Sequence, residues 1–295
     1  MGKQLYVKRK TVLKNELFFK YGLRCVHSGK KRRQDFRTKV MEINNDMLEN
    51  FFTEIYDYEG ARIAQHSGKH LHKAVLKRPE YASGDIENAL KQGFLDLDHM
   101  MQHDEILKDE LAGTTAVCVL LRKGKLYCGN VGDSRSIASV AGCVEELSSD
   151  HKPSLASEQR RITAAGGWVE LNRVNGNLAL SRALGDFVFK KNEQKGPEEQ
   201  IVTALPEVEI RDYNEDWEFI ILACDGIWDV MTNEEVIEFV RMRLGQGMEP
   251  EDICEDLMTR CLAPDCQMGG LGCDNMTVVL ITLLHGGTWK QLNKK

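Results

Sequence analysis

Three aspartates stand where apolar runs of the sequence end or begin. Asp225 follows the run at 219–224, Asp274 precedes the run at 276–284, and Asp133 follows the run at 126–131. A carboxylate at the end of a buried strand is costly unless it is paired or holds a cation. One such aspartate is usually a turn residue or a helix cap. Three of them favour a site of oxygen ligands for a hard metal ion.

The composition is that of a globular protein able to bury a core. The 295 residues are 42% hydrophobic and 28% charged, as in soluble domains. We find no run of 18 apolar residues and no apolar N-terminal segment, so neither a membrane span nor a signal peptide is expected. The nine cysteines are odd in number and scattered. They predict reduced thiols in a cytoplasmic or nuclear protein.

Charge is unevenly distributed. Residues 1–40 hold 13 Lys or Arg and two acidic residues, a balance of +11, which leaves −17 for the rest of a chain of net charge −6. The cluster Lys30-Lys-Arg-Arg33 could attract nucleic acid or anionic lipid, but it lacks the interleaved aromatic residues of nucleic-acid binders. A solvated basic arm is expected instead, with no nucleic-acid partner.

The start Met1-Gly2 matches an N-myristoylation signal weakly, because Tyr6 replaces the favoured Ser or Thr. Membrane contact is expected only if Gly2 is acylated.

No Pro/Ser-rich linker or internal repeat divides the chain, so one domain is expected over residues 21–286, preceded by a basic arm (1–20) and followed by a short tail (287–295). The pair Thr232 and Glu235 has the spacing of a capping box. Paired helices and consecutive hairpins predict an α+β fold of antiparallel sheets covered by helices. The expected helices are 61–76, 86–107, 157–165, 233–244 and 251–261, and the expected strands are 47–57, 114–121, 126–130, 136–140, 168–171, 219–224 and 276–284.

From about residue 112 to 284 the sequence resembles the metal-dependent protein Ser/Thr phosphatases (PPM, or type 2C). The segments that carry the resemblance occur in family order. They are Gly113-Thr-Thr-Ala, Gly129-Asn-Val-Gly-Asp133-Ser-Arg, Ser149-Asp-His-Lys-Pro153, Gly176-Asn-Leu-Ala-Leu-Ser-Arg182-Ala-Leu-Gly-Asp186, Ala223-Cys-Asp225-Gly-Ile-Trp-Asp229 and Gly272-Cys-Asp274-Asn-Met-Thr.

The resemblance implies a two-sheet antiparallel β-sandwich flanked by pairs of helices, in four layers. It implies a monomer whose substrates are phosphorylated intracellular proteins. Two Mn²⁺ or Mg²⁺ ions, with a third and weaker one, would bind phosphate and activate a water for in-line attack on phosphorus. By motif match, Asp225 and Asp274 hold the first metal, Asp133 supports the third, Asp57 bridges the two main metals, and Tyr58 supplies a backbone carbonyl. Asp57, Asp225 and Asp274 are thus the expected catalytic residues.

The N-terminal part departs from the family pattern. Gln34 stands where the family has a Glu that reaches the second metal through water, and Lys30 stands where it has a phosphate-binding Arg. Lysine keeps the charge without the bidentate fork, and Arg32 or Arg33 could compensate, so Lys30 and Arg33 are the expected phosphate contacts. Glu59 replaces the His proposed as general acid. A shift of the local alignment by one residue would instead put Tyr56 at the bridging position.

These departures leave two hypotheses. The first is a metal-dependent protein Ser/Thr phosphatase, with activity reduced by the changes at Gln34 and Glu59. The second is a catalytically impaired scaffold that uses the same fold to bind phosphoproteins or kinases.

Several other residues have simpler interpretations. His66, His70 and His72 are expected to form a solvent-facing cluster on a helix, because no acidic third ligand is evident. His151 is expected to fix a turn, Arg182 and Asp186 to brace a loop, and Trp228 to lie in the core.

Overall fold

The structure, a computed structural model, describes residues 6–7, 24–25, 36–43, 50–57, 61–264 and 270–285. They form two compact units. Unit 1 takes its described residues from Met1–Met47, Ser136–Glu146 and Tyr213–Lys295, and unit 2 from Leu48–Arg135 and Leu147–Asp212.

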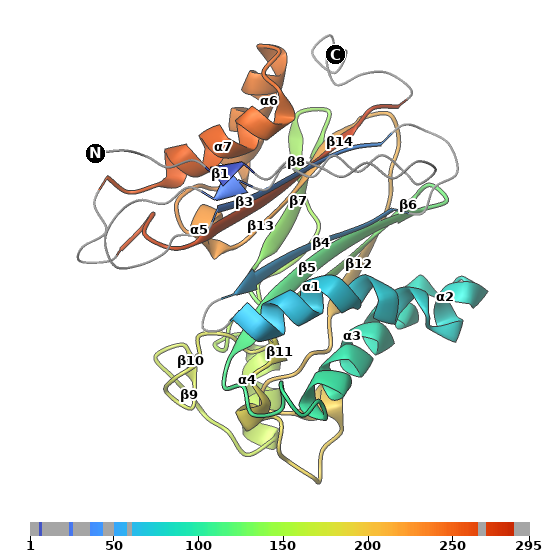
Figure 1. The fold of residues 1–295 in the computed structure, drawn as a ribbon, viewed down its shortest axis with the longest axis vertical. Helices are drawn as coiled ribbons and strands as arrows, with labels where there is room; N and C mark the ends of the chain where they lie inside the picture. The colour runs from blue at the N-terminus through green and yellow to red at the C-terminus, as the bar shows by residue number, and fades with distance from the viewer. Residues whose placement is uncertain are drawn as a thin grey trace. The chain divides into compact units, whose positions relative to one another are not determined.

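Unit 2 is built on a five-stranded sheet with a pair of helices on one face. The strands β4, β5, β6 and β12 pair in antiparallel fashion, and β11 pairs with the start of β5. Helices α1 and α3 pack on each other and lie along this sheet (Figure 1). The elements are β4 (Asn50–Asp57), α1 (Ala61–Leu76), α2 (Pro79–Ser83), α3 (Ile86–Gln102), β5 (Gly113–Arg122), β6 (Lys125–Val131), α4 (Ala156–Ala164), β9 (Val169–Glu170), β10 (Arg173–Val174), β11 (Leu184–Gly185), the 3-10 turns η1 (Phe187–Phe189) and η2 (Pro197–Glu199), and β12 (Glu207–Asp212).

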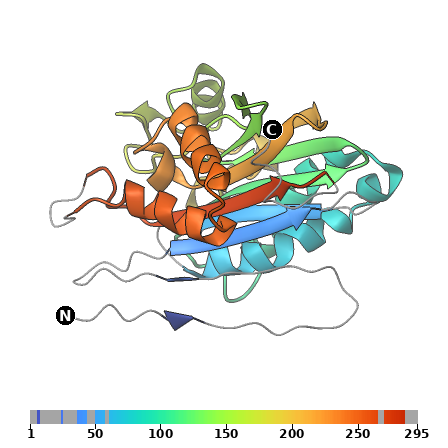
Figure 2. The same cartoon turned by 90° about the horizontal axis from the view of Figure 1, so that it is seen from above.

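Unit 1 has its own five-stranded sheet, in the order β3-β14-β13-β7-β8. The pairs β13–β14 and β7–β8 are antiparallel, whereas β3 runs parallel to β14 over eight registered positions. The orange helices α6 and α7 pack on each other, and α7 lies over β3 and the red strand β14 (Figure 2). The elements are β1 (Tyr6–Val7), β2 (Arg24–Cys25), β3 (Phe36–Ile43), β7 (Arg135–Val140), β8 (Cys143–Glu146), β13 (Trp217–Ala223), α5 (Asp225–Trp228), α6 (Asn233–Gly245), α7 (Pro250–Cys261) and β14 (Met276–Leu283).

Each unit buries its own apolar core. In unit 2 the apolar faces of α1 and α3, with Leu71, Leu90 and Phe94, pack against alternate residues of β5. In unit 1, α6 and α7 pack against β13 and β14, whose residues are buried along their whole length. Strands buried on both faces lose the polar alternation of a half-exposed strand, which explains the continuous apolar runs beside Asp225 and Asp274.

The fold class predicted from the sequence is confirmed: the chain is α+β, with mainly antiparallel sheets and paired helices. Helix α1 has the predicted bounds, and Thr232 and Glu235 form the predicted capping box at the start of α6.

The prediction for α3 was too long at its C-terminal end. The helix stops at Gln102 rather than at Leu107. The side chain of Asp104 accepts hydrogen bonds from the backbone N–H groups of Ile106 (2.9 Å) and Leu107 (3.1 Å). This local bonding competes with helix continuation.

Strands β3 and β12 were not predicted. Charged residues interrupt both, with Arg37, Lys39 and Glu42 in β3 and Glu207, Glu209 and Arg211 in β12. They join their sheets through long-range backbone pairing, which hydrophobic periodicity does not reveal.

A buried ion pair connects α3 to the segment that follows β11. The Lys190 ammonium donates to both oxygens of Asp98 (2.8 Å each) and to the carbonyl of Ala183 (2.8 Å). Asp98 also accepts from the N–H of Gly185 (2.8 Å), where β11 pairs with β5. Burial raises the pKa of the Asp98 carboxyl, and Lys190 counteracts that effect. A β-carbon at Gly185, whose φ is +80°, would lie 2.7 Å from the carbonyl oxygen of Ala112, so only glycine fits this junction.

Among the residues that the structure describes, no helix has the length and hydropathy that a membrane span requires.

Replacing Lys190 should destabilise unit 2 strongly. Lys190→Met leaves the Asp98 carboxylate buried without its counter-charge, and we expect a loss of about 3–5 kcal/mol in the free energy of unfolding. The double variant Asp98→Asn/Lys190→Met should recover most of this, because the amide oxygen still accepts from Gly185. Urea unfolding measures both, with Lys125→Met as the control, since Lys125 pairs with Asp212 at an exposed site. Equal losses for Lys190→Met and Lys125→Met would contradict the role of the buried pair.

Candidate metal and phosphate site

In unit 1 the pairing of β13 with β14 brings two predicted acidic ligands to one edge of the sheet. Ala223, the last residue of β13, pairs with Val278 near the start of β14. Asp225 comes two residues after Ala223, at the start of α5, and Asp274 comes two residues before Met276. Because the strands are antiparallel, the end of one and the beginning of the other meet at this edge.

Cys224 holds the backbone next to Asp225 against the backbone that follows Asp274. Its N–H donates to the carbonyl of Thr277 (3.3 Å), and its Sγ contacts the carbonyl oxygen of Asn275 (3.4 Å) and the N–H of Thr277 (3.2 Å). A β-carbon at Gly226 would clash with the carbonyl oxygen of Asn275. The segments around Asp225 and Asp274 therefore touch, and Gly226 is required for that approach.

In unit 2 the ends of β4 and β6 lie on either side of β5. Asp57 is the last residue of β4 and pairs with Thr114, while Val131 at the end of β6 pairs with Ala116. Asp133 follows two residues after Val131. Next to it, the hydroxyls of Thr115 and Ser134 form a hydrogen bond of 2.8 Å. Asp57 and the turn that carries Asp133 thus lie at one edge of the unit 2 sheet.

Asp133 is buried and paired with a lysine that the sequence analysis did not single out. Its side chain accepts a short hydrogen bond from the ammonium of Lys152. Burial raises the pKa of the Asp133 carboxyl, while Lys152 opposes this shift. Close by, Arg135 binds both oxygens of Asp150 (2.9 Å each). The segment Asp150-His-Lys152 is therefore tied to the turn after β6 by two ion pairs.

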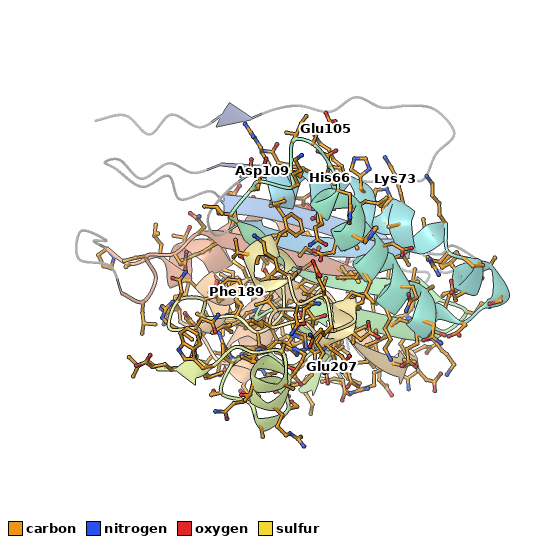
Figure 3. All side chains as sticks on the ribbon, turned by 90° about the horizontal axis from the view of Figure 1, so that it is seen from below. His66, Lys73, Glu105, Asp109, Phe189 and Glu207 are labelled. Atoms are coloured by element: carbon orange, nitrogen blue, oxygen red, sulfur yellow. The ribbon has the colours of Figure 1, made fainter. Side chains whose placement is uncertain are left out.

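His151 fixes this turn, as predicted. Its backbone N–H donates to the carbonyl of Gly132 (2.9 Å), and its Nδ1 lies 3.2 Å from the backbone nitrogen of Gly132. On the other side of the ring, Nε2 lies 3.4 Å from a carboxylate oxygen of Glu207, which Figure 3 labels at the start of β12. The proximity of the His151 ring lowers the pKa of Glu207.

Glu158 organises the loop that carries the Ser181-Arg182 motif. This buried carboxylate on α4 accepts from Arg161 (2.7 Å), from the hydroxyl of Ser181 (2.6 Å) and from Arg182 (2.8 Å). Arg182 also donates to the carbonyl of Leu205 (3.1 Å). Burial opposes ionisation of Glu158, but hydrogen bonds and charges from Arg182 and Arg161 outweigh it and lower the pKa to about 2. Arg182 thus braces the loop, as expected.

Over residues 19–268 the sequence matches the family described as protein phosphatase 2C. The chain belongs to the protein phosphatase 2C family. A probable protein phosphatase 2C of Caenorhabditis elegans is 55% identical over 265 residues, which are 90% of this chain and 74% of that protein. A protein phosphatase 2C homolog of Hypocrea jecorina is 43% identical over 276 residues, which are 91% of this chain and 63% of that protein.

Solved structures agree with this assignment. A phosphatase from Toxoplasma gondii superposes with a TM-score of 0.69 at 25% identity, over 81% of this chain and 85% of that one. The structure of a C. elegans sex determining protein gives a TM-score of 0.68 at 24% identity, over 85% of this chain and 60% of that one. The second comparison concerns the fold alone. By family membership the chain is of the PPM type.

Several predicted site residues of this protein phosphatase 2C chain lie outside the described residues: Lys30, Arg33, Gln34, Tyr58 and Glu59. For Asp57 the structure describes the backbone, which lies at the end of β4. Among the described side chains of residues 62–264 and 270–285, no group of three or more His, Cys, Asp or Glu residues comes together as a metal site. The proposed ligand set contains Asp57 and Tyr58, which are not among those side chains.

The histidines on α1 do not gather a third ligand among the described side chains. His66, labelled in Figure 3, and His70 are half-buried, with ring centroids 4.4 Å apart. Burial and the charge of His70 lower the pKa of His66. Trp228 is buried in the core of unit 1, as predicted, and its indole N–H donates to the carbonyl of Ala223 (2.7 Å).

The edge of the unit 1 sheet that carries Asp225 and Asp274 offers the oxygen donors that a hard divalent cation prefers. Asp225 and Asp274 supply carboxylate oxygens, and the Cys224 and Gly226 contacts hold their backbone in place. Mg²⁺ and Mn²⁺ prefer such oxygen donors and usually keep several waters, so two protein carboxylates suffice.

The pKa of Glu158 predicts a specific loss of stability in acid. The folded-state pKa is lowered from 4.5 to about 2, so the stabilisation is fully present above pH 4.5 and disappears as the pH falls through 2. It amounts to ~3 kcal/mol. Glu158→Gln removes this dependence, so its free energy of unfolding should fall less between pH 5 and pH 3 than that of the wild type.

Urea unfolding at several pH values tests this expectation, with the exposed Glu193→Gln as the matched control. The control should keep the wild-type slope. Parallel curves for Glu158→Gln and the wild type would show that the network around Glu158 does not depend on its charge.

Proposed function

We propose that this chain is a metal-dependent protein serine/threonine phosphatase that hydrolyses phosphoserine and phosphothreonine in phosphorylated proteins. The observation that supports this most is the position of Asp225 and Asp274 at one end of the β13–β14 pair. Because the chain covers 74% of the nematode relative and 63% of the Hypocrea one, activity and substrates remain part of the proposal.

Mn²⁺ or Mg²⁺, when bound, supplies positive charge for the phosphate and a water of lowered pKa. The chain's contribution is to hold the ligands. Asp225 follows a fully buried strand, and the Cys224 contacts to Asn275 and Thr277 fix its backbone against the segment that carries Asp274. Carboxylates on a fixed backbone need little ordering when a cation arrives, which lowers the entropic cost of binding.

Asp133 is proposed as the ligand of a third and weaker metal ion. Its carboxylate already accepts from the Lys152 ammonium. A cation must displace or share this partner, so a lower affinity at Asp133 follows. We further propose Asp57 as a bridging ligand, Tyr58 as a source of a backbone carbonyl, and Lys30 and Arg33 as phosphate contacts, in line with the family resemblance.

The remaining expectations are proposals as well. They are a phosphatase domain over residues 21–286 with a basic arm before it and a short tail after it, a monomeric state, and a cytoplasmic or nuclear location.

A specific observation favours a second candidate, a catalytically impaired scaffold that binds phosphoproteins or kinases. By the family resemblance, Gln34 and Glu59 stand where the family has a Glu and a His. Loss of a general acid alone costs about 10²–10⁴ in rate. A folded chain without turnover would support this alternative.

Hydrolysis of p-nitrophenyl phosphate and of a phosphothreonine peptide by the purified chain tests the proposal. We expect turnover with Mn²⁺ or Mg²⁺, none with EDTA, and a loss of about 100-fold or more in Asp225→Asn, since even partners of metal ligands contribute 10–100-fold. Asp216→Asn, an exposed carboxylate of the same unit, is the matched control and should retain activity. Absence of turnover from folded protein at millimolar Mn²⁺ would reject the enzyme and leave the scaffold.

A further inference from the structure

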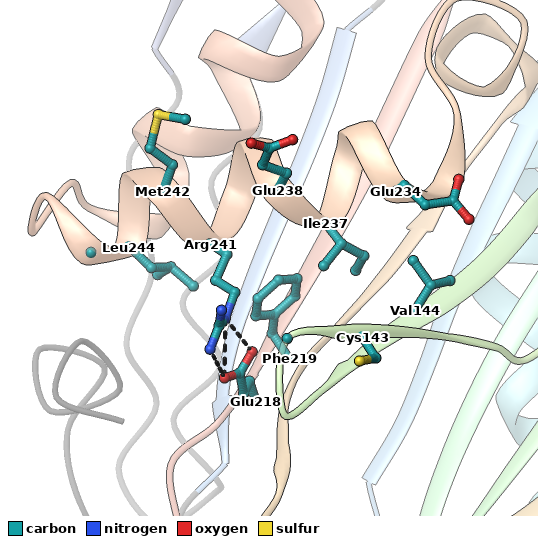
Figure 4. A pocket seen from close by; sticks show the side chains of 12 residues that line it. Cys143, Val144, Glu218, Phe219, Glu234, Ile237, Glu238, Arg241, Met242 and Leu244 are labelled. Atoms are coloured by element: carbon teal, nitrogen blue, oxygen red, sulfur yellow. Dashed lines mark hydrogen bonds and ion pairs between the residues drawn. The ribbon is translucent and has the colours of Figure 1, made fainter.

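A groove of about 860 Å³ runs between the hairpin strand β8 and helix α6 of unit 1 (Figure 4). Cys143 and Val144 form one wall, and α6 forms the other. The floor is apolar, with Phe219, Ile237 and Leu244 in the core beneath it. None of these residues belongs to the proposed metal site.

Polar contacts join the elements that form this groove. The side-chain amide of Asn233 donates to Glu146 (2.7 Å), which ties the start of α6 to β8. Within the lining, Arg241 donates to both oxygens of Glu218 (3.0 Å each), and the hydroxyl of Ser139 donates to the same carboxylate (2.5 Å). These contacts connect α6 to β8 and β13, the elements on either side of the groove.

The Arg241 guanidinium also lies on the turn between β7 and β8. A β-carbon at Gly142, whose φ is +82°, would lie 2.7 Å from a guanidinium nitrogen of Arg241. Arg241 is thus held between Glu218 and this turn, and it neutralises the Glu218 carboxylate.

The rim is acidic and has an exposed apolar side chain beside it. Glu234 and Glu238 line the groove one helical turn apart, and both are exposed. Neither forms an ion pair with any residue that the structure describes. Like charges at this spacing repel each other. The helix dipole favours Glu234 in the first turn of α6 but does not extend to Glu238. Met242, 52% exposed, follows Glu238 by one turn, and methionine adapts readily to different apolar partners.

We propose that this groove docks a basic peptide segment of a partner protein, with an apolar side chain between Val144 and Ile237 and Lys or Arg side chains on Glu234 and Glu238. Charge complementarity supports this occupant. The lining has three carboxylates and one guanidinium, and that guanidinium is already paired with Glu218.

Docking at this groove is separate from the proposed chemistry. Glu218 and Phe219 stand at the start of β13, whereas Asp225 follows its end. At about 3.3 Å per residue the strand places roughly 17 Å between Glu218 and Ala223. Binding is therefore measurable whether or not the chain is an active phosphatase.

Two readouts test the proposal with the full chain. The first is fluorescence anisotropy of a labelled synthetic peptide in which a Phe-Leu pair is flanked by lysines. The second is alkylation of Cys143, an exposed thiol in the groove wall, followed residue by residue with mass spectrometry. We expect saturable binding that weakens with salt, and protection of Cys143 at the same peptide concentrations. Glu234→Lys/Glu238→Lys should weaken binding about tenfold, since each reversal replaces an attraction with a repulsion.

The control variant Glu193→Lys/Glu198→Lys changes the net charge equally at exposed sites of unit 2, and it should bind within about twofold of the wild type. A peptide with glutamates in place of the lysines should not bind. Equal weakening in both variants would show a general charge effect and overturn the proposal, as would binding without protection of Cys143. If Cys143 becomes protected from alkylation as the protein concentration rises, with no peptide present, a second copy of the chain is the occupant and the proposal is overturned.

Discussion

The candidate site of unit 1 depends on one interaction, the backbone pairing of β13 with β14. Both strands are buried along their length, so their N–H and C=O groups must pair with each other or with neighbouring strands. In the observed register Ala223 pairs with Val278, and this register places Asp225 and Asp274 at the same edge. Slipping it by one residue would turn every buried side chain of a strand to the opposite face. The position of the two carboxylates thus follows from the burial of the apolar residues that flank them.

In unit 2 strand pairing also brings acidic residues to one edge of a sheet, and cationic partners offset the cost of burying carboxylates. Asp57 ends β4 and Asp133 follows β6, the two strands that flank β5. Three buried carboxylates of this unit have cationic partners. Lys152 binds Asp133, Lys190 binds Asp98, and two arginines surround Glu158. A buried charge whose partner is removed is destabilising by several kcal/mol, so these pairs hold the loops around the strand ends in a single arrangement. Rigid loops are what a phosphate site needs if its ligands are to be in place before the substrate arrives.

Local sequence signals predicted most of the elements and the α+β class. Helix α1 follows from its periodicity and α6 from its capping box, while β13 and β14 follow from their apolar runs. The aspartates could be identified from the sequence because each stands where an apolar run ends or begins. What could not be predicted is non-local. The parallel pairing of β3 with β14 joins segments more than 200 residues apart, and Asp98 meets Lys190 across 92 residues of sequence. Glu158 gave no signal on its own, since only the folded chain brings Arg161 and Arg182 to it. Lys30, Arg33, Tyr58 and Glu59 remain predictions.

In the proposed phosphatase, Asp225 and Asp274 hold one metal ion, because β13 and β14 bring them together. We would measure this with a double-mutant cycle in Mn²⁺ affinity, with free Mn²⁺ followed by electron paramagnetic resonance. If the two carboxylates share an ion, Asp225→Asn and Asp274→Asn each weaken the same site, and the double variant loses little more than the weaker-binding single variant, since one lost ligand already disables the site. Additive losses, or wild-type affinity in either single variant, would show that the two carboxylates do not share a metal ion.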